Sequence, residues 1–169
     1  FRSSMTQLGK YKILSPIGSG AFAEVYKAQD QDLQRIVALK VLRPALLADA
    51  DAFGRFIQEA RVAGSLFHPH IATVLDMGQA NGRYYLAMRF VDGPGLEVVL
   101  RERGPLPWAE ALAVMDQVGG ALSFAHQRGI IHRDVKPSNI LLSREPGEGA
   151  VLTDFGLVKA MSASSVATL

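Results

Sequence analysis

His132-Arg133-Asp134-Val135-Lys136-Pro137-Ser138-Asn139 is the stretch that decides how this sequence is interpreted. It places one carboxylate, two cations and one amide within eight residues, directly before an apolar run that begins at Ile140. Its charges follow neither the helical nor the strand period, so it is not the polar face of a regular element. A charged surface loop is the plain interpretation, and a loop that carries out chemistry is the one we favour.

A second polar stretch, Asp154-Phe155-Gly156, follows the short apolar run Val151-Leu152-Thr153. Asn139 and Asp154 would then stand at the ends of two adjacent strands. Amide and carboxylate oxygens in such a place suit a hard Mg²⁺ ion that bridges a polyphosphate. An Asp beside a glycine is also common in plain turns, so this stretch alone leaves both interpretations open.

The run Gly18-Ser19-Gly20-Ala21-Phe22-Ala23 lies between two expected strands. Glycines there let backbone N–H groups approach anionic oxygens without a Cβ in the way, although many ordinary hairpins also contain two glycines. No Gly-Lys-Ser/Thr follows, which excludes a Walker loop. A strand rather than a helix follows, which argues against a dinucleotide-binding turn.

Two charged residues lie among apolar neighbours. Lys40 closes the apolar run 37–39, and Glu59 lies between Phe56 and Ala63 on the apolar face of the following helix. A strand-end Lys can reach water along its flexible stem, but a buried charge is normally paired. If Lys40 and Glu59 pair with each other, each supplies the opposite charge that the other needs among apolar neighbours.

Composition limits the classes of protein that fit. The 169 residues suit one domain or two small lobes, and the absence of Cys excludes a disulfide framework, a thiolate metal site and a cysteine nucleophile. A net charge of +2 gives no reason to expect nucleic acid as a partner. No apolar run is long enough to span a membrane. Residues 1–7 are expected to be a tag remnant or an N-terminal extension.

The apolar pattern predicts an α+β chain with two lobes. A five-stranded antiparallel sheet is expected from strands at 11–17, 24–28, 36–42, 71–75 and 84–91, with one helix that ends at 67. The dipeptide Asn81-Gly82 predicts a tight hairpin between the last two strands. After a linker at 92–95, we expect helices at 96–103 and 107–128 and short strands at 140–143 and 151–153.

The longest expected helix, at 107–128, carries an apolar stripe with spacings of three and four. Its members are Trp108, Leu112, Met115, Val118, Leu122 and Ala125. The pair Gly119-Gly120 should weaken this helix by about 1 kcal/mol per glycine, which suggests close packing there.

Taken in order, the glycine-rich turn, the strand Lys, the helix Glu, the His-Arg-Asp loop with its Asn and the Asp-Phe-Gly stretch resemble the protein kinase family from about Leu8 to Lys159. The likeness is to bacterial, eukaryotic-like Ser/Thr kinases. Lys136, two residues after Asp134, resembles the Ser/Thr-directed form, whereas tyrosine kinases usually carry a different residue there. The resemblance implies a bilobal, protein-kinase-like fold. Its N-lobe would span 8–91, and a partial, mainly helical C-lobe would span 92–169 and end within the activation segment.

The resemblance also implies catalytic roles for single residues. Asp134 would accept the proton of the substrate hydroxyl or align that hydroxyl, and Lys136 would steady the transferred phosphoryl group. Lys40, oriented by Glu59, would hold the α- and β-phosphates of ATP.

The ATP site would lie between the lobes, with Mg²⁺ held by Asn139 and Asp154. Met88 would gate the rear pocket, and the backbone of residues 89–91 would form the hinge that binds the adenine edge. The residues expected to contact ATP are Ile17, Gly18, Ser19, Gly20, Ala21, Phe22, Ala23, Val25, Ala38, Lys40, Met88, Arg89, Phe90, Val91 and Leu141.

The sequence departs from the family pattern at three places. Ala23 replaces the third glycine of the loop, and Arg89 stands at a hinge position where an acidic residue is common. Both are expected to have small effects, because the first residue is small and the hinge works through its backbone. No Ala-Pro-Glu segment precedes Leu169, so we expect a truncated catalytic domain, or part of a longer chain, with an exposed apolar face.

The function that the resemblance implies is an ATP- and Mg²⁺-dependent protein Ser/Thr kinase in the cytoplasm, acting on a protein substrate. Autophosphorylation would fall on Ser162, Ser164, Ser165 or Thr168, and the resemblance allows a homodimer. The alternative is a nucleotide-binding, kinase-like module, either a pseudokinase or an inactive fragment, that serves as a scaffold. A small-molecule phosphotransferase is a third interpretation, and Lys136-Pro137 argues against it.

Overall fold

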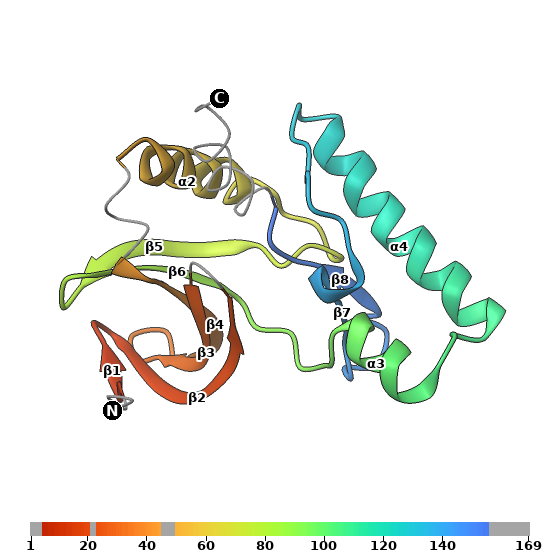
Figure 1. Cartoon of the computed structure of the whole chain (residues 1–169), viewed down its shortest axis with the longest axis horizontal. Coiled ribbons are helices and arrows are strands. Elements are labelled where there is room, and N and C mark those ends of the chain that lie inside the picture. Colours follow the sequence, from red (N-terminus) through yellow and green to blue (C-terminus); the bar gives the residue numbers. More distant parts are fainter. Residues whose placement is uncertain (1–4, 21–22, 45–49, 156–169) are drawn as a thin grey trace, which may run out of the picture.

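The computed structural model describes residues 5–20, 23–44 and 50–155. A curled antiparallel sheet forms one end of this described part, and helices α3 (Leu96–Arg103) and α4 (Trp108–His126) form the other (Figure 1). Helix α2 (Ala50–Ala63) runs along the sheet, and the hairpin of β7 (Ile140–Leu142) and β8 (Ala150–Leu152) lies between the sheet and α4. The predicted α+β class is therefore confirmed. Over the same residues, no helix is long and apolar enough to cross a membrane.

The N-terminal sheet has six strands in the order β1-β2-β3-β4-β6-β5, and all neighbours are antiparallel. The strands are β1 (Gln7–Leu8), β2 (Tyr11–Ser19), β3 (Ala23–Asp30), β4 (Arg35–Leu42), β5 (Val74–Ala80) and β6 (Arg83–Arg89).

The expected count of five strands is wrong because β1 was not foreseen. Gln7 and Leu8 fold back onto β2 across Gly9, whose φ of 56° lies in the left-handed region that glycine adopts at little cost. Leu8 is fully buried there beside Tyr11. A two-residue strand is too short to leave an alternating pattern in the sequence.

The predicted hairpin between β5 and β6 is confirmed. Asn81 and Gly82 have φ values of 50° and 73°, the left-handed pair that a tight two-residue turn requires. Its first strand, however, begins at Val74 and not at Ile71 as expected. Ile71 instead forms a parallel bridge to Leu152 in β8, so this apolar run joins the two halves of the molecule.

Helix α2 covers the sheet and ends earlier than expected. Phe56 and Ala60 pack against sheet residues on its inner face. The helix ends at Ala63 rather than at position 67, because the N–H groups of residues 65 and 66 bond to carbonyls three positions back and tighten the last turn. Phe67 therefore leaves the helix face and is 71% exposed.

Helix α4 covers a second core. Its buried residues Val118, Ala121 and Ala125 belong to the same apolar cluster as Leu152 of β8. The rest of the predicted stripe is largely exposed, as expected, and includes Trp108, Leu112 and Met115. The expectation of close packing at Gly119-Gly120 is wrong, because a Cβ at either position would meet no atom within 4 Å apart from its chain neighbours and the backbone of its own helix.

The exposure of Trp108 gives a spectroscopic prediction. The chain contains a single Trp, and its side chain is 77% exposed at the first residue of α4. The folded protein should therefore emit near the wavelength of the chain unfolded in denaturant, with acrylamide quenching close to that of a free indole. A clearly blue-shifted emission that resists acrylamide would contradict the exposure of this face.

Candidate active site

The loop at 132–139 is held in place by a buried His. His132 is 1% exposed, its Nε2 donates to the carbonyl of Thr153 at 2.8 Å, and its Nδ1 accepts the N–H of Asp134 at 3.2 Å. Burial lowers the pKa of His132, so the neutral ring with its proton on Nε2 satisfies both bonds. Arg133, between the two anchored residues, has a φ of 66°, which is uncommon for a side-chain-bearing residue.

Asp134 has two side-chain partners within the same loop. Lys136 Nζ lies 2.9 Å from Asp134 Oδ2. Asn139 Nδ2 donates to that oxygen at 3.0 Å and to the Asp134 carbonyl at 2.8 Å. The hydrogen bond from Lys136 is the main cause that lowers the pKa of Asp134, burial opposes it, and the bond from Asn139 adds to the lowering. The carboxylate is therefore ionised at neutral pH.

An ion pair between Lys40 and Asp154 joins the two halves of the molecule. Lys40 Nζ lies 2.8 Å from Asp154 Oδ1, and the two side chains are 11% and 24% exposed. The two-residue period of β4 turns Lys40 away from the face that buries Val37, Leu39 and Val41. Asp154 reaches it from just beyond β8 with a φ of 61°.

The pairing of Lys40 with Glu59 stays a prediction. The backbone of Glu59 lies in α2 as expected, but its side chain lies outside the described part of the structure. The partner that the structure does describe for Lys40 is Asp154. Other predicted residues that fall outside the described ranges are Ala21, Phe22, Ser162, Ser164, Ser165 and Thr168.

Asn139 and Asp154 lie at adjacent strand ends, as expected. Asn139 closes the 3-10 helix η1 (Pro137–Asn139) directly before β7, and the N–H of Thr153 donates to the Asn139 carbonyl at 2.9 Å. Among the described residues, no group of three or more His, Cys, Asp or Glu could hold a metal ion. One carboxylate and one amide fit an ion such as Mg²⁺, which takes its remaining ligands from phosphates and water.

Several residues predicted to contact a nucleotide share one face of the sheet. Val25 of β3 stands opposite Lys40 of β4, and Ala38 of β4 stands opposite Met88 of β6. Because residues directly opposite each other point to the same face of a sheet, these side chains lie together. Their face is the one from which Lys40 reaches Asp154.

The remaining nucleotide candidates are more scattered. Val91 and Leu141 meet in a small apolar cluster that joins the chain after β6 to β7. Lys27 Nζ lies 4.7 Å from the centre of the Phe90 ring. Ala23 buries its side chain in the cluster that contains Phe56 of α2. The residues Ile17, Gly18, Ser19 and Gly20 form the exposed end of β2 and the turn after it.

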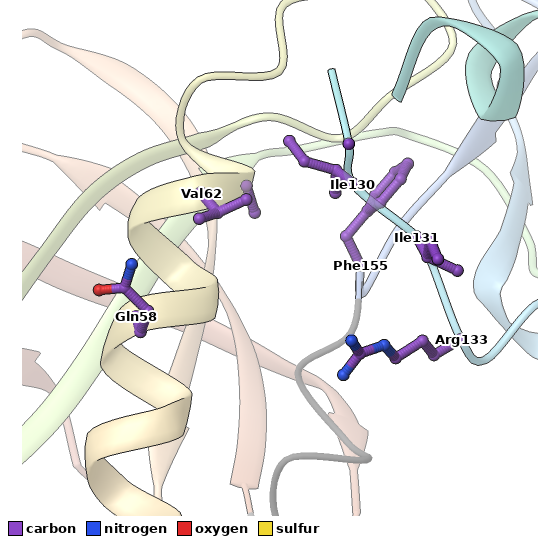
Figure 2. Close-up of a pocket in the computed structure, with 8 residues that line it drawn as sticks. Gln58, Val62, Ile130, Ile131, Arg133 and Phe155 are labelled. Atoms are coloured by element: carbon purple, nitrogen blue, oxygen red, sulfur yellow. The ribbon is translucent and has the colours of Figure 1, made fainter. Parts of the chain in front are cut away.

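A separate cavity of about 130 Å³ lies between α2 and the segment that precedes the 132–139 loop (Figure 2). Phe155 lines it, and the centre of its ring lies 4.6 Å from that of His132, which links the cavity to the loop. The cavity was not predicted from the sequence: Arg133 and Phe155 belong to the two motif stretches, but the other lining residues carry no motif and only the fold brings them together. The lining residues are Gln58, Val62, Ala63, Gly129, Ile130, Ile131, Arg133 and Phe155.

The fold and the site together are typical of a protein kinase domain. Lys40 of the curled antiparallel sheet pairs with Asp154 after β8, and the loop with Asp134, Lys136 and Asn139 lies beside this pair. The chain belongs to the protein kinase domain family, whose model matches residues 11–169. The resemblance in the sequence is therefore confirmed at the level of the family.

Several mycobacterial proteins are similar to this chain. Serine/threonine-protein kinase PknE of Mycobacterium bovis is 43% identical over 155 residues, and PknJ of the same organism is 46% identical over 153 residues. These matches cover 92% and 89% of this chain but only 27% and 26% of the relatives, so the chain spans about a quarter of their length. The crystal structure of a point mutant of the Mycobacterium tuberculosis PknI kinase domain superposes with a TM-score of 0.79 at 41% identity. That superposition covers 92% of this chain and 62% of the PknI chain.

The lowered pKa of His132 predicts how stability changes with pH. The unfolded chain takes up a proton on this His near its ordinary pKa of 6.5, whereas the folded protein resists it. Stability is therefore lost as pH falls below about 6.5, by at most about 1.4 kcal/mol per pH unit from this residue. Urea unfolding of His132→Gln, measured between pH 7.5 and 5.5, should show a smaller loss than the parent.

The exposed His126 in the last turn of α4 provides the matched control. His126→Gln should keep the pH dependence of the parent, because it leaves the buried His132 and its hydrogen bonds in place. An equal loss of stability in the parent and in His132→Gln would contradict the buried, neutral state of His132.

Proposed function

We propose that the chain is the N-lobe, at 8–91, and the first part of the C-lobe, at 92–169, of a protein Ser/Thr kinase. The reaction is transfer of the γ-phosphoryl group of ATP to a Ser or Thr hydroxyl of a protein. The observation that carries the proposal is the pairing of Lys40 with Asp154 beside an Asp134 that is held by both Lys136 and Asn139. Family membership and relatives named as Ser/Thr kinases support it.

The proposed roles follow from charge. In the transition state, negative charge spreads over the phosphoryl oxygens, so catalysis consists mainly of positioning and fixed positive charge. Lys40 supplies one such charge from the sheet and Lys136 supplies another from the loop. Asn139 and Asp154 would hold Mg²⁺, which when bound neutralises the charge on the phosphate oxygens.

Asp134 is proposed to orient the hydroxyl that attacks. Its lowered pKa makes it a weak base, so it suits a reaction in which the hydroxyl loses its proton late. Asn139 fixes the carboxylate through Nδ2, which leaves the Asn139 Oδ1 for the metal. A single amide thus links the metal ligands to the acceptor site.

The adenine is proposed to lie between the apolar residues of the sheet and Leu141 of β7. Val25, Ala38 and Met88 provide the sheet side, and the backbone of residues 89–91 provides the hydrogen bonds. Ile17 is proposed to cover the ring from the end of β2. Gly18, Ser19, Gly20, Ala21, Phe22 and Ala23 would supply backbone N–H groups to the phosphates.

Replacing Asp134 by Asn tests the proposed reaction. Asp134→Asn should lower the turnover of phosphate transfer by about 10²–10⁴-fold, because it removes the group that aligns and deprotonates the hydroxyl. Its dissociation constant for MgATP should stay within about twofold of the parent. Turnover is measured on a Ser/Thr-containing protein substrate, and intact mass records autophosphorylation, in the longest available form of the protein that contains this chain.

The exposed Asp116 on α4 allows the same chemical change away from the site. Asp116→Asn should keep both turnover and MgATP affinity. Unchanged turnover in Asp134→Asn would exclude the proposed mechanism. MgATP binding by a parent that transfers no phosphate would instead favour a kinase-like module that binds nucleotide without catalysis.

A further inference from the structure

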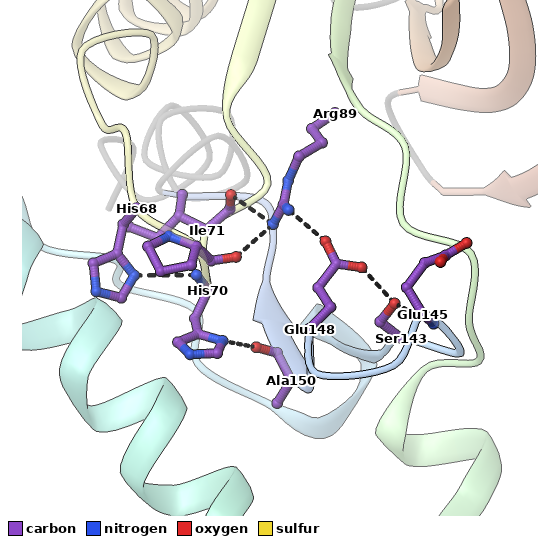
Figure 3. Close-up of polar contacts among 9 residues, drawn as sticks. His68, His70, Ile71, Arg89, Ser143, Glu145, Glu148 and Ala150 are labelled. Carbon is purple, nitrogen blue, oxygen red and sulfur yellow. Dashed lines mark hydrogen bonds and ion pairs between the residues drawn. The ribbon is translucent and has the colours of Figure 1, made fainter.

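The side chain of Arg89 connects three segments that are distant in the sequence (Figure 3). Arg89 ends β6, and its N–H donates to the carbonyl of Thr73 at 2.9 Å. Its guanidinium donates through Nη2 to the carbonyls of Pro69 at 2.7 Å and Ile71 at 3.2 Å. Through Nη1 it forms an ion pair with Glu148, 2.5 Å from Oε1, in the loop between β7 and β8. These side-chain contacts of Arg89 were not predicted from the sequence.

The carboxylate that receives Arg89 is itself held in place. Glu148 Oε2 accepts the hydroxyl of Ser143, and Ser143 Oγ in turn accepts the N–H of Glu145 at 3.1 Å. The Glu148 side chain is 23% exposed and that of Arg89 is 31% exposed. Both carboxylate oxygens therefore have a partner, so this pair loses less side-chain freedom on forming than an ordinary surface pair does.

The turn that Arg89 contacts is also bonded to β8. The Leu152 N–H donates to the His70 carbonyl, and the Ala72 N–H donates to the Leu152 carbonyl, both at 2.9 Å. The His70 ring bonds through Nδ1 to the carbonyl of Ala150 at 2.8 Å. Arg89 is thus linked to β8 by two routes, one through Glu148 and one through the turn at 68–71.

These two routes limit how the hinge can move. Residues 89–91 connect the sheet to the C-terminal half, and β7 and β8 carry Asn139 and Asp154 at their ends. A rotation of the hinge relative to this hairpin would break the bonds of Arg89 to Glu148, Pro69 and Ile71 together. Loss of several bonds at once makes such a rotation costly even though each bond alone is modest.

We propose that Arg89 is a positioning residue that holds the hinge in register with the β7–β8 hairpin and thereby pre-organises the nucleotide site. The proposal rests on the proposed function, because the hinge backbone is the part assigned to the adenine. A pre-organised site loses less conformational freedom when the nucleotide binds. Arg89 therefore acts on nucleotide affinity more than on the phosphoryl transfer step.

The geometry also explains why Arg is needed at this position. The planar guanidinium presents separate N–H groups to a carboxylate and to two carbonyls at the same time. A Lys ammonium in its place can pair with Glu148 but cannot reach all three acceptors in a fixed arrangement. The MgATP dissociation constant of Arg89→Lys should therefore lie between those of the parent and of Arg89→Ala.

The test compares MgATP affinity, by calorimetry, with amide hydrogen exchange in the absence of nucleotide. Arg89→Ala should raise the MgATP dissociation constant about 10-fold, which lies within the usual range for coupled sites. It should also speed exchange in both the 68–73 turn and the 143–152 hairpin. The loss of MgATP affinity in the double variant Arg89→Ala with Glu148→Gln should be smaller than the two single losses combined, because the two residues share one contact.

Arg144 and Asp92 supply the matched control. They form a second ion pair between the chain after the hinge and the β7–β8 loop, at 3.0 Å, with side chains 68% and 56% exposed. Arg144→Ala removes a cation from the same loop but breaks only an exposed pair, so MgATP affinity should stay within about twofold of the parent.

Two results would overturn the proposal while the proposed function stands. One is an MgATP affinity of Arg89→Ala equal to, or tighter than, that of the parent. The other is faster exchange confined to the residues next to Arg89, with the 143–152 hairpin unchanged. A parent that does not bind MgATP at all would instead overturn the proposed function, and the exchange comparison would still show whether Arg89 joins the two segments.

Discussion

The ion pair between Lys40 and Asp154 is the interaction on which the rest of the site depends. Lys40 comes from a central strand of the sheet and Asp154 follows the short hairpin of the C-terminal half. Each is a mostly buried charge, and a buried charge without a partner destabilises a protein by several kcal/mol. The contact between the two halves therefore also brings charged groups of the candidate site together.

Two loops that carry the candidate catalytic groups are bonded to each other near this pair. His132 and Asn139 both bond to the backbone of Thr153, His132 as a side-chain donor to its carbonyl and Asn139 through a carbonyl that accepts its N–H. Thr153 is the residue directly before Asp154. The loop that carries Asp134 is thus hydrogen-bonded to the residue directly before Asp154, which fixes the two loops against each other.

The parts of the structure that the sequence predicts well are those governed by local chemistry. The helix at 96–103 has the predicted bounds because Gly95 precedes its apolar pattern and Gly104 ends it. Asn81-Gly82 forms its hairpin because the turn requires two left-handed residues. The 132–139 loop and Asp154 come together because two short apolar strands that pair must bring their flanking residues side by side.

The errors arise where contacts between distant segments decide the outcome. Ile71 was expected to begin a strand of the sheet. It instead pairs with β8, because the backbones of His70 and Ala72 on either side of it bond to Leu152. Phe67 fits the helical period, yet the helix has already ended at Ala63. For Arg89, the family pattern drew attention to the backbone, and only the fold shows that Glu148 and two carbonyls lie within reach of its side chain.

Charged groups from the two halves of the molecule are proposed to form a single site for ATP and Mg²⁺. The most direct measurement is the ATP dissociation constant of the parent and of Asp154→Asn, each with and without Mg²⁺. We expect Mg²⁺ to tighten ATP binding to the parent at least about 10-fold and to have little effect on Asp154→Asn. An equal effect of Mg²⁺ on both proteins, or ATP binding by the parent that does not depend on Mg²⁺, would contradict this account of the site.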